Sequence, residues 1–246
     1  NTLVVLPTGM GKTSSAFMLA SHRLNQFPNS KVLVLACTRP LVDQHYETFK
    51  KHLDIDESKI ILLTGHINPE KRQELWNNAQ VIIATPQAIE NDMIGGNVPI
   101  DDISLLVIDE AHRATGNYSY CYVAKKYMKH AKYPRILALT ASPGSDMEQI
   151  KEVCQNLFIE AVEVRTDKDP DVNPYIHDIG MEWISVELPP VFLEIKKSLS
   201  AFLNSRLEKL KSSGIMQKSD IGFISKRDLL ELQAQLRGKI STGEKD

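Results

Sequence analysis

The chain has 246 residues, 42% of them hydrophobic and 24% charged, with a formal net charge of −2. This length suffices for one large core, or for one core with a smaller domain attached. The near balance of charges gives no general attraction to nucleic acid or to membranes, and no apolar run approaches the roughly 18 residues of a membrane span. We therefore expect a soluble protein that has no membrane partner.

Seven short apolar segments recur along the chain and predict β-strands. They lie at residues 3–6, 32–36, 60–63, 81–84, 105–108, 136–139 and 161–164. Helical patterns occur between them, and Ser145 or Asp146 can cap the last one. These patterns lie at residues 14–24, 40–52, 69–77, 120–130 and 146–157. Short strands that are unbroken by polar residues and joined by helices are typical of a parallel sheet covered on both faces. The predicted fold class is α/β, with a lobe of the RecA-like type.

The pattern changes after this α/β region. Residues 167–174 are rich in Asp, Asn and Pro and predict turns, whereas the alternating residues 181–188 predict one more strand. From residue 191 the apolar positions follow helical steps, and a second helical pattern comes later. Its leucines are Leu229, Leu230, Leu232 and Leu236. We expect an α/β lobe at 1–166, a connector with one strand at 167–190, and part of a helical domain at 191–246.

The most informative stretch joins the first predicted strand to the first predicted helix. Its residues are Leu6, Pro7, Thr8, Gly9, Met10, Gly11, Lys12 and Thr13. The two glycines let backbone N–H groups point at a polyphosphate, Lys12 can neutralise its outer charge, and the Thr13 hydroxyl can bind Mg²⁺. The spacing fits G-x-x-x-x-G-K-[ST], except that Leu6 stands at the first glycine. The stretch predicts a phosphate-binding loop, with an ordinary strand–turn–helix connection as the alternative.

A second motif follows the strand predicted at 105–108, where the chain continues with Asp109, Glu110, Ala111 and His112. Carboxylates at the C-terminal end of a parallel strand face the crevice in which α/β sheets bind ligands. Asp109 is then placed to hold Mg²⁺ through its water shell, and Glu110 to orient and deprotonate an attacking water. Alone, this acidic pair could be a solvated helix start. Together with the first motif it predicts a site for ATP and Mg²⁺.

Polar residues also follow three other predicted strands, where the same edge of the sheet would expose them. They are Thr38, Arg39, Gln44, Gly65 and Thr85. Proteins use hydroxyls, guanidinium groups and the N–H groups at helix starts to hold the phosphates of a nucleic-acid strand without reading its bases. Each segment could be an ordinary loop, but three at one edge favour a strand-binding surface.

Two further hydroxyls follow the strand predicted at 136–139. Thr140 and Ser142 would lie near His112, and hydrogen bonds among the three could relay the state of the nucleotide to the strand-binding loops. A Ser/Thr-rich turn before Pro143 is the plain alternative. We interpret the two hydroxyls as coupling residues.

The three cysteines, Cys37, Cys121 and Cys154, are far apart in the sequence and show no C-x-x-C spacing. Neither a disulfide framework nor a zinc site is therefore expected. This cysteine usage favours a reducing, intracellular setting.

Taken in order, these motifs resemble those of superfamily 2 helicases of the DEAH type. The matching segments are residues 7–13, 38–41, 64–65, 85–87, 109–112 and 140–142. Three longer stretches, 109–118, 139–145 and 171–175, are similar to the family that contains archaeal Hef and the Fanconi anaemia M translocase. Dicer and the RIG-I-like receptors are related but have Cys in place of Ala111.

The resemblance implies an ATP-dependent helicase or translocase that acts on branched DNA, such as stalled forks, in repair and fork restart. It implies Lys12, Asp109, Glu110 and His112 as catalytic residues, and a helical insertion that begins near Pro189. It also implies a second motor lobe and, as in Hef, a nuclease domain in the full-length protein, located in an archaeal cytoplasm. Since an arginine-bearing motif of the second lobe completes the site, we expect residues 1–246 alone to bind nucleotide weakly and hydrolyse it slowly.

Two other functions stay open. One is an ATPase activated by double-stranded RNA, as in the Dicer and RIG-I group. The other is a non-catalytic scaffold with a degenerate nucleotide pocket. The second is disfavoured because Asp109 is followed by Glu110, and binding alone would not require a base beside the metal ligand.

Overall fold

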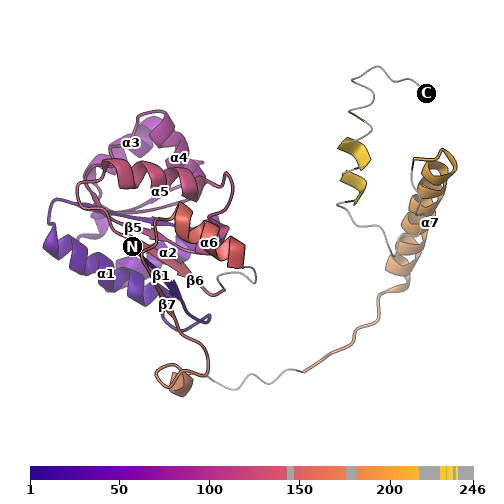
Figure 1. Cartoon of the computed structure of the whole chain (residues 1–246), viewed down its shortest axis with the longest axis horizontal. Coiled ribbons are helices and arrows are strands. Elements are labelled where there is room, and N and C mark those ends of the chain that lie inside the picture. The colour runs from indigo at the N-terminus through magenta and orange to yellow at the C-terminus, as the bar shows by residue number, and fades with distance from the viewer. Residues whose placement is uncertain (143–146, 176–181, 216–227, 231, 235–236, 238–246) are drawn as a thin grey trace. The chain divides into compact units, whose positions relative to one another are not determined.

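The computed structural model describes residues 1–142, 147–175, 182–215, 228–230, 232–234 and 237. The chain separates into two compact units, Asn1–Asp178 and Ile179–Asp246. The first unit is an α/β lobe and the second contains one long helix (Figure 1).

A seven-stranded sheet forms the centre of the first unit, in the order β3-β4-β2-β5-β6-β1-β7. All of its neighbouring strands are parallel. The strands are β1 (Thr2–Val5), β2 (Lys31–Leu35), β3 (Ile60–Leu63), β4 (Val81–Ala84), β5 (Ile103–Ile108), β6 (Ile136–Thr140) and β7 (Ala161–Val164). All seven strands predicted from the sequence are confirmed. The apolar runs of β2, β4, β5 and β6 occupy buried positions, as expected for a parallel sheet, whereas the four residues of the edge strand β7 are exposed.

Helices cover both faces of this sheet (Figure 1). They are α1 (Lys12–Gln26), α2 (Arg39–His52), α3 (Pro69–Asn78), α4 (Pro86–Ile94), α5 (Ser119–His130) and α6 (Met147–Asn156), with short 3₁₀ turns η1 (Glu57–Lys59), η2 (Ala111–Arg113) and η3 (Asn173–Tyr175). The five helices predicted from the sequence are confirmed, and the proposed caps of α6, Ser145 and Asp146, lie outside the described residues.

The core has two parts, one on each face of the sheet. Side chains of α1 and α2, such as Ala20 and Phe49, pack with Val32 and Val34 of β2 on one face. On the other face, side chains from α3 to α6 pack with the alternate residues of the same strand. Because successive side chains of β2 point to opposite faces, this strand contributes to the core on both sides of the sheet, as expected for a sheet buried on both faces.

Helix α4 was not predicted from the sequence. It is short, and its apolar residues are too few to make a long helical stripe. The available signals were Pro86 in the first turn, where the ring suits a helix start, and Gly95 at the end. Ile89 of this helix is fully buried in the core.

The strand predicted at 181–188 is wrong for the part that the structure describes. Residues 182–189 form no regular secondary structure, and none of the described strands pairs with them. An alternating pattern becomes a strand only where a neighbour supplies the ladder of hydrogen bonds. Without one, Trp183 and Val186 stay exposed, at 90% and 80%.

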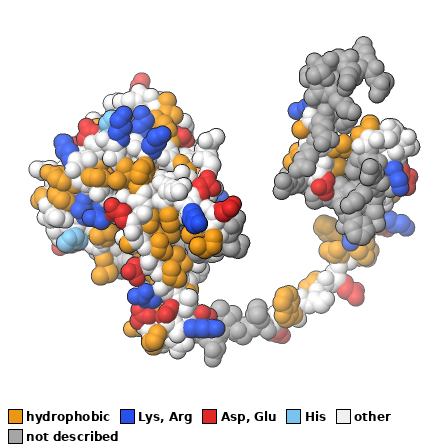
Figure 2. All heavy atoms as spheres, in the orientation of Figure 1, with side chains coloured by type: hydrophobic (Ala, Val, Ile, Leu, Met, Phe, Trp, Pro, Cys, Tyr) orange, Lys and Arg blue, Asp and Glu red, His pale blue; other side chains and the backbone are white. Residues whose placement is uncertain are grey.

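Helix α7 (Pro190–Ser212) confirms the helical pattern that begins near residue 191. Many of its apolar side chains are exposed, among them Phe192, Leu199 and Phe202, and hydrophobic groups are visible on this part of the chain in Figure 2. Within the later pattern, residues 228–230 and 232–234 are helical, and Leu236 lies outside the described residues. Among the helices described, none is long and apolar enough to cross a membrane.

Candidate active site

The loop between β1 and α1 is shaped by two glycines. Gly9 has a φ of 83° and Gly11 a φ of 89°, values in the left-handed region that other residues rarely adopt. Gly11 is also the N-terminal cap of α1, and the first turn of that helix contains no acidic residue. The loop therefore presents backbone N–H groups at the positive end of a helix, which suits an anion such as phosphate.

Lys12 is held at the base of this loop. Its ammonium donates hydrogen bonds to the carbonyl oxygens of Leu6, at 2.9 Å, and Pro7, at 3.2 Å. These partners are neutral, so the positive charge of Lys12 is not cancelled by a carboxylate in this arrangement. The side chain is available to a polyphosphate lying in the loop.

Asp109 stands at the C-terminal end of β5, and its side chain is bound on both oxygens. Oδ1 accepts from the backbone N–H of Glu110 at 3.0 Å, and Oδ2 lies 2.8 Å from Nε2 of His45. Its backbone carbonyl accepts a hydrogen bond from the hydroxyl of Tyr120 at 2.7 Å. Burial raises the pKa of Tyr120, which keeps this hydroxyl protonated and able to donate.

Glu110 has an unusual backbone conformation. Its φ of 51° and ψ of 48° place a non-glycine residue in the left-handed region. Such a conformation costs of order 1–3 kcal/mol and occurs mainly where the surrounding structure enforces it, often at functional sites. The turn directs the Glu110 carboxylate to within 3.3 Å of Nδ1 of His112.

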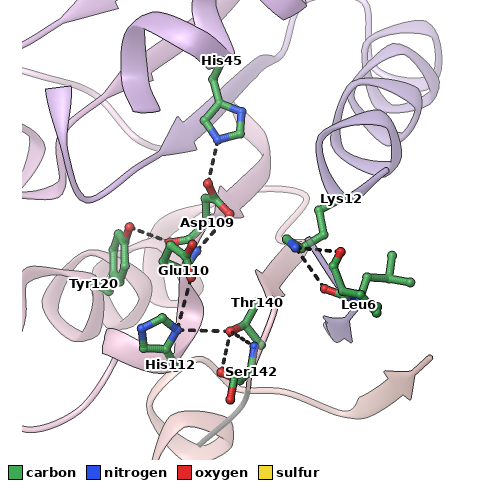
Figure 3. A network of polar contacts seen from close by, with 10 residues as sticks. Leu6, Lys12, His45, Asp109, Glu110, His112, Tyr120, Thr140 and Ser142 are labelled. Carbon is green, nitrogen blue, oxygen red and sulfur yellow. Dashed lines mark hydrogen bonds and ion pairs between the residues drawn. The ribbon is translucent and has the colours of Figure 1, made fainter. Parts of the chain in front are cut away.

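His112, Thr140 and Ser142 form the polar network expected from the sequence. Nδ1 of His112 lies 3.1 Å from the hydroxyl of Thr140, which donates to the backbone carbonyl of Ser142 at 2.7 Å. The same hydroxyl oxygen accepts from the Ser142 N–H at 3.2 Å. Figure 3 shows this chain of contacts linking the end of β5 to the end of β6.

The two sequence motifs meet in one cavity of about 330 Å³. It is lined by Thr8, Gly9, Gly11, Lys12, Thr13, Leu41, Gln44, His45, Asp109 and Glu110. Lys12 and Asp109 therefore face the same space, from either side of it in Figure 3. Pro7 takes part through its carbonyl bond to Lys12, while Met10 lines a neighbouring cavity beside Asp171 and Tyr175.

The residues of this cavity fit a magnesium-bound polyphosphate. Among the described residues, no group of three or more His, Cys, Asp or Glu side chains could hold a metal by itself. Mg²⁺ differs from metals that need such a cage, because it commonly uses one or two protein oxygens together with water and substrate phosphates. Thr13 and Asp109 can supply those oxygens.

The proposed strand-binding residues lie at the ends of neighbouring strands. Thr38 and Arg39 follow β2, Gly65 comes after β3, and Thr85 follows β4, and these three strands are adjacent in the sheet. Thr38, Arg39 and Gly65 are exposed. Gln44, grouped with them from the sequence, lies instead in the cavity with Lys12.

His45 is the site residue that sequence reasoning missed. Helical periodicity holds a signal for it, because Leu41 and His45 are four residues apart and so share one face of α2. That face is the one that lines the cavity. The sequence could not show that α2 packs beside the end of β5.

The family described as DEAD/DEAH box helicase matches residues 1–150, more than half of the chain. The chain belongs to this family. A crystal structure of the Hef helicase domain from Pyrococcus furiosus is 44% identical to the chain, with a TM-score of 0.71, and the match covers 100% of the chain and 51% of that structure. The RecA-like fold and the resemblance to Hef are both confirmed.

Two curated relatives extend the comparison. A Methanocaldococcus jannaschii protein, named provisionally as an ATP-dependent RNA helicase, is 46% identical over 235 residues, or 96% of the chain and 29% of that protein. The Drosophila melanogaster DEAD-box ATP-dependent DNA helicase Fancm is 37% identical over 249 residues, or 100% of the chain and 17% of that protein. The chain therefore spans less than a third of either relative.

Proposed function

We propose that this chain is the ATP-binding lobe of a DNA helicase or translocase that acts on branched DNA in repair and fork restart. The observation that carries the proposal is that Lys12 and Asp109, from two distant motifs, line one cavity. A phosphate loop with an ammonium on one side and a carboxylate on the other is the arrangement used to bind a nucleoside triphosphate with Mg²⁺.

Each residue of the cavity has a proposed role. Lys12 and the loop N–H groups hold the phosphates, and Thr13 and Asp109 hold Mg²⁺, which supplies charge neutralisation when bound. Glu110 takes a proton from the attacking water. Its position next to Asp109, on a turn that fixes its direction, supports this assignment.

His112, Thr140 and Ser142 are proposed to connect hydrolysis to movement. The contact between His112 and Thr140 joins the turn that carries Glu110 to the end of the adjacent strand. A change in the position of His112 on hydrolysis would therefore move Thr140 at the end of β6, and this movement would extend to the surface of the lobe.

Thr38, Arg39, Gly65 and Thr85 are proposed to hold the DNA backbone. Their location at the ends of three adjacent strands gives a continuous edge. Thr38 and Thr85 are the N-terminal caps of α2 and α4. The first-turn N–H groups of these helices, except at Pro40 and Pro86, which have none, lack an intrahelical partner and can bind phosphate. Basic and acidic side chains are interspersed on the visible face of the lobe in Figure 2, which favours local contacts over a broad electrostatic field.

DNA is favoured over RNA because a relative is named as the DNA helicase Fancm, and a branched substrate is what the resemblance to the Hef family implies. An ATPase activated by double-stranded RNA is the second candidate, because another relative is named as an RNA helicase. Comparing fork-shaped DNA with double-stranded RNA as activators of the complete motor separates the two. Stronger activation by the RNA duplex would overturn the DNA assignment.

We also propose the domain organisation of the motor. Residues 1–166 are the ATP-binding lobe, 167–190 the connector, and 191–246 part of a helical insertion, with a second lobe and a nuclease domain as further parts of the full-length protein. The exposed apolar side chains of α7 support an insertion that packs against further protein. The free thiols of Cys37, Cys121 and Cys154 favour an intracellular location. The similarity to proteins of Methanocaldococcus jannaschii and Pyrococcus furiosus supports an archaeal cell.

The role of Glu110 provides the direct test. Glu110→Gln in the complete motor is expected to abolish ATP turnover while leaving ATP binding unchanged, because the amide keeps the size of the side chain but cannot accept the proton. Glu47→Gln, on the exposed surface of α2, is the matched control and should keep full turnover. Normal turnover in the Glu110 variant would remove this residue from the mechanism.

A further inference from the structure

His45 makes a buried contact with the carboxylate at the centre of the proposed metal site. Its Nε2 lies 2.8 Å from Oδ2 of Asp109, and the two side chains are only 5% and 10% exposed. Figure 3 shows the ring pointing from α2 directly at this carboxylate. The two residues are 64 positions apart in the sequence, so the contact links α2 to the end of β5.

The contact completes a set of bonds that fixes Asp109. The Glu110 N–H binds Oδ1, His45 binds Oδ2, and the Tyr120 hydroxyl binds the backbone carbonyl. A carboxylate has about four lone-pair positions, so each oxygen still has one available for a metal or a metal-bound water. Asp109 is thus held in one orientation without losing its capacity to bind Mg²⁺.

The other ring nitrogen shows that packing alone does not explain His45. Nδ1 is buried and has no hydrogen-bond partner among the described residues. Buried polar atoms in proteins are nearly always paired, and a leucine would fill a helix–sheet contact without leaving one unpaired. Within the described structure, the imidazole of His45 makes its hydrogen bond to Asp109.

We propose that His45 is a positioning residue of the metal site, which orients Asp109 so that Mg²⁺ and its water shell meet a carboxylate that is already in place. The inference rests on the proposed function, since it takes Asp109 as the group that faces the metal. Groups that orient a metal-binding side chain typically change metal affinity or activity by about 10- to 100-fold. Because α2 begins at Arg39, the helix that would hold the DNA strand also holds the metal ligand.

The test measures how much Mg²⁺ strengthens nucleotide binding. The probe is a fluorescent N-methylanthraniloyl ADP, which is titrated into the 246-residue chain once with Mg²⁺ and once with EDTA. The quantity compared is the dissociation constant in EDTA divided by the dissociation constant with Mg²⁺. His45→Leu is expected to reduce this ratio by about 10- to 100-fold, with little change in EDTA. His45→Gln, whose amide N–H can reach Oδ2, should retain most of it.

Two controls keep the outcome clear. His22→Leu, at an exposed position on α1, should leave the ratio unchanged. In an Asp109→Asn background, His45→Leu should have no further effect, because the carboxylate that it orients is gone. A purely structural role would instead lower the binding of nucleotide equally with Mg²⁺ and EDTA, and His45→Gln would not rescue it.

The results also separate the two proposals. An unchanged ratio in His45→Leu, with a Mg²⁺-dependent wild-type chain, would overturn the role of His45 and leave the ATP site standing. Absence of any Mg²⁺-dependent binding by the wild-type chain would overturn the ATP site itself. If His45→Leu does not fold, His45→Ala is measured in its place by the same ratio. A loss of the ratio in His45→Ala that His45→Gln does not show supports the role of His45, and an unchanged ratio overturns it.

Discussion

The imidazole of His112 and the hydroxyl of Thr140 lie 3.1 Å apart and join the turn after β5 to the end of β6. Thr140 is fully buried, and its hydroxyl also bonds the backbone of Ser142 in both directions. The turn that carries Glu110 and the segment after β6 are therefore held together by side-chain hydrogen bonds close to the proposed site of hydrolysis.

Replacing the Thr140 hydroxyl should weaken the coupling between DNA binding and ATP turnover. Thr140→Val keeps the shape of the side chain but removes its donor and acceptor, so DNA-stimulated ATP turnover of the complete motor should fall by about 10-fold, the order expected for losing a coupling energy near 1.4 kcal/mol. Nucleotide affinity should change little, because Thr140 does not line the cavity. Thr48→Val on α2 is the control. Equal stimulation of Thr140→Val and the wild-type chain would count against coupling through this bond.

The buried ion pair between Arg72 and Asp92 should be essential to the stability of the lobe. Arg72 of α3 binds both carboxylate oxygens of Asp92 in α4, with Nε at 2.6 Å, and also binds the carbonyl of Ile67. The hydrogen bond that the Arg72 guanidinium donates to Asp92 raises the pKa of Arg72, and the two side chains are 6% and 1% exposed. Arg72→Met should therefore lower the free energy of unfolding by about 3–5 kcal/mol, since it leaves a buried charge unpaired.

The double variant Arg72→Met/Asp92→Leu provides the control for this prediction. It removes both charges, so it should be more stable than Arg72→Met alone. Urea unfolding followed by circular dichroism measures both. If the double variant loses as much stability as the two single variants added together, the cost does not come from the unpaired charge.

Gly11→Ala should damage both stability and nucleotide binding. At a φ of 89° an alanine is strained by roughly 1–2 kcal/mol, although a Cβ there meets no atom closer than 3.8 Å. The backbone rather than crowding therefore limits this position. Gly65→Ala, where no positive φ occurs and a Cβ meets open space, should leave the free energy of unfolding within about 0.5 kcal/mol of the wild-type value. Equal losses in the two variants would contradict this reasoning.

Tyr127 should make the lobe sensitive to alkaline pH. Burial raises its pKa to about 12, whereas an unfolded chain releases this proton near pH 10. The stabilisation is complete below pH 10 and is lost as the pH rises toward 12, because the unfolded state then binds fewer protons than the folded state. Once the pH exceeds 12, the lost free energy is about 3 kcal/mol.

Urea unfolding at pH 9 and pH 11 tests the role of Tyr127. Tyr127→Phe should be less stable at pH 9, because the hydroxyl donates to the carbonyl of Arg135 and accepts from its N–H. The further loss on going to pH 11 should be smaller in this variant. Tyr120 also has a raised pKa but is present in both proteins, so the difference isolates Tyr127. An identical alkaline loss in both would show that Tyr127 does not titrate in this range.

The amino-acid sequence by itself determined the elements of the lobe and the chemistry of its site. Hydrophobic runs specify strands, and the spacing of Gly9, Gly11 and Lys12 specifies a phosphate loop, because both depend on interactions between residues close in the chain. The same local rules overlooked the short helix α4 and assigned a strand to residues 181–188, whose described part has no described neighbour to form a ladder of hydrogen bonds with. Strand formation depends on a distant partner, so periodicity alone could not decide it.

Only the tertiary structure decided which of these residues meet. The strand order places β2 beside β5, so α2, which follows β2, brings Gln44 and His45 to the cavity that contains Asp109. No local pattern encodes that neighbourhood, because it arises from packing α2 onto one face of the sheet while the chain crosses over to form β5. The groups that could bind ATP are recognisable in the sequence, whereas the contact between His45 and Asp109 becomes visible only once the sheet is assembled.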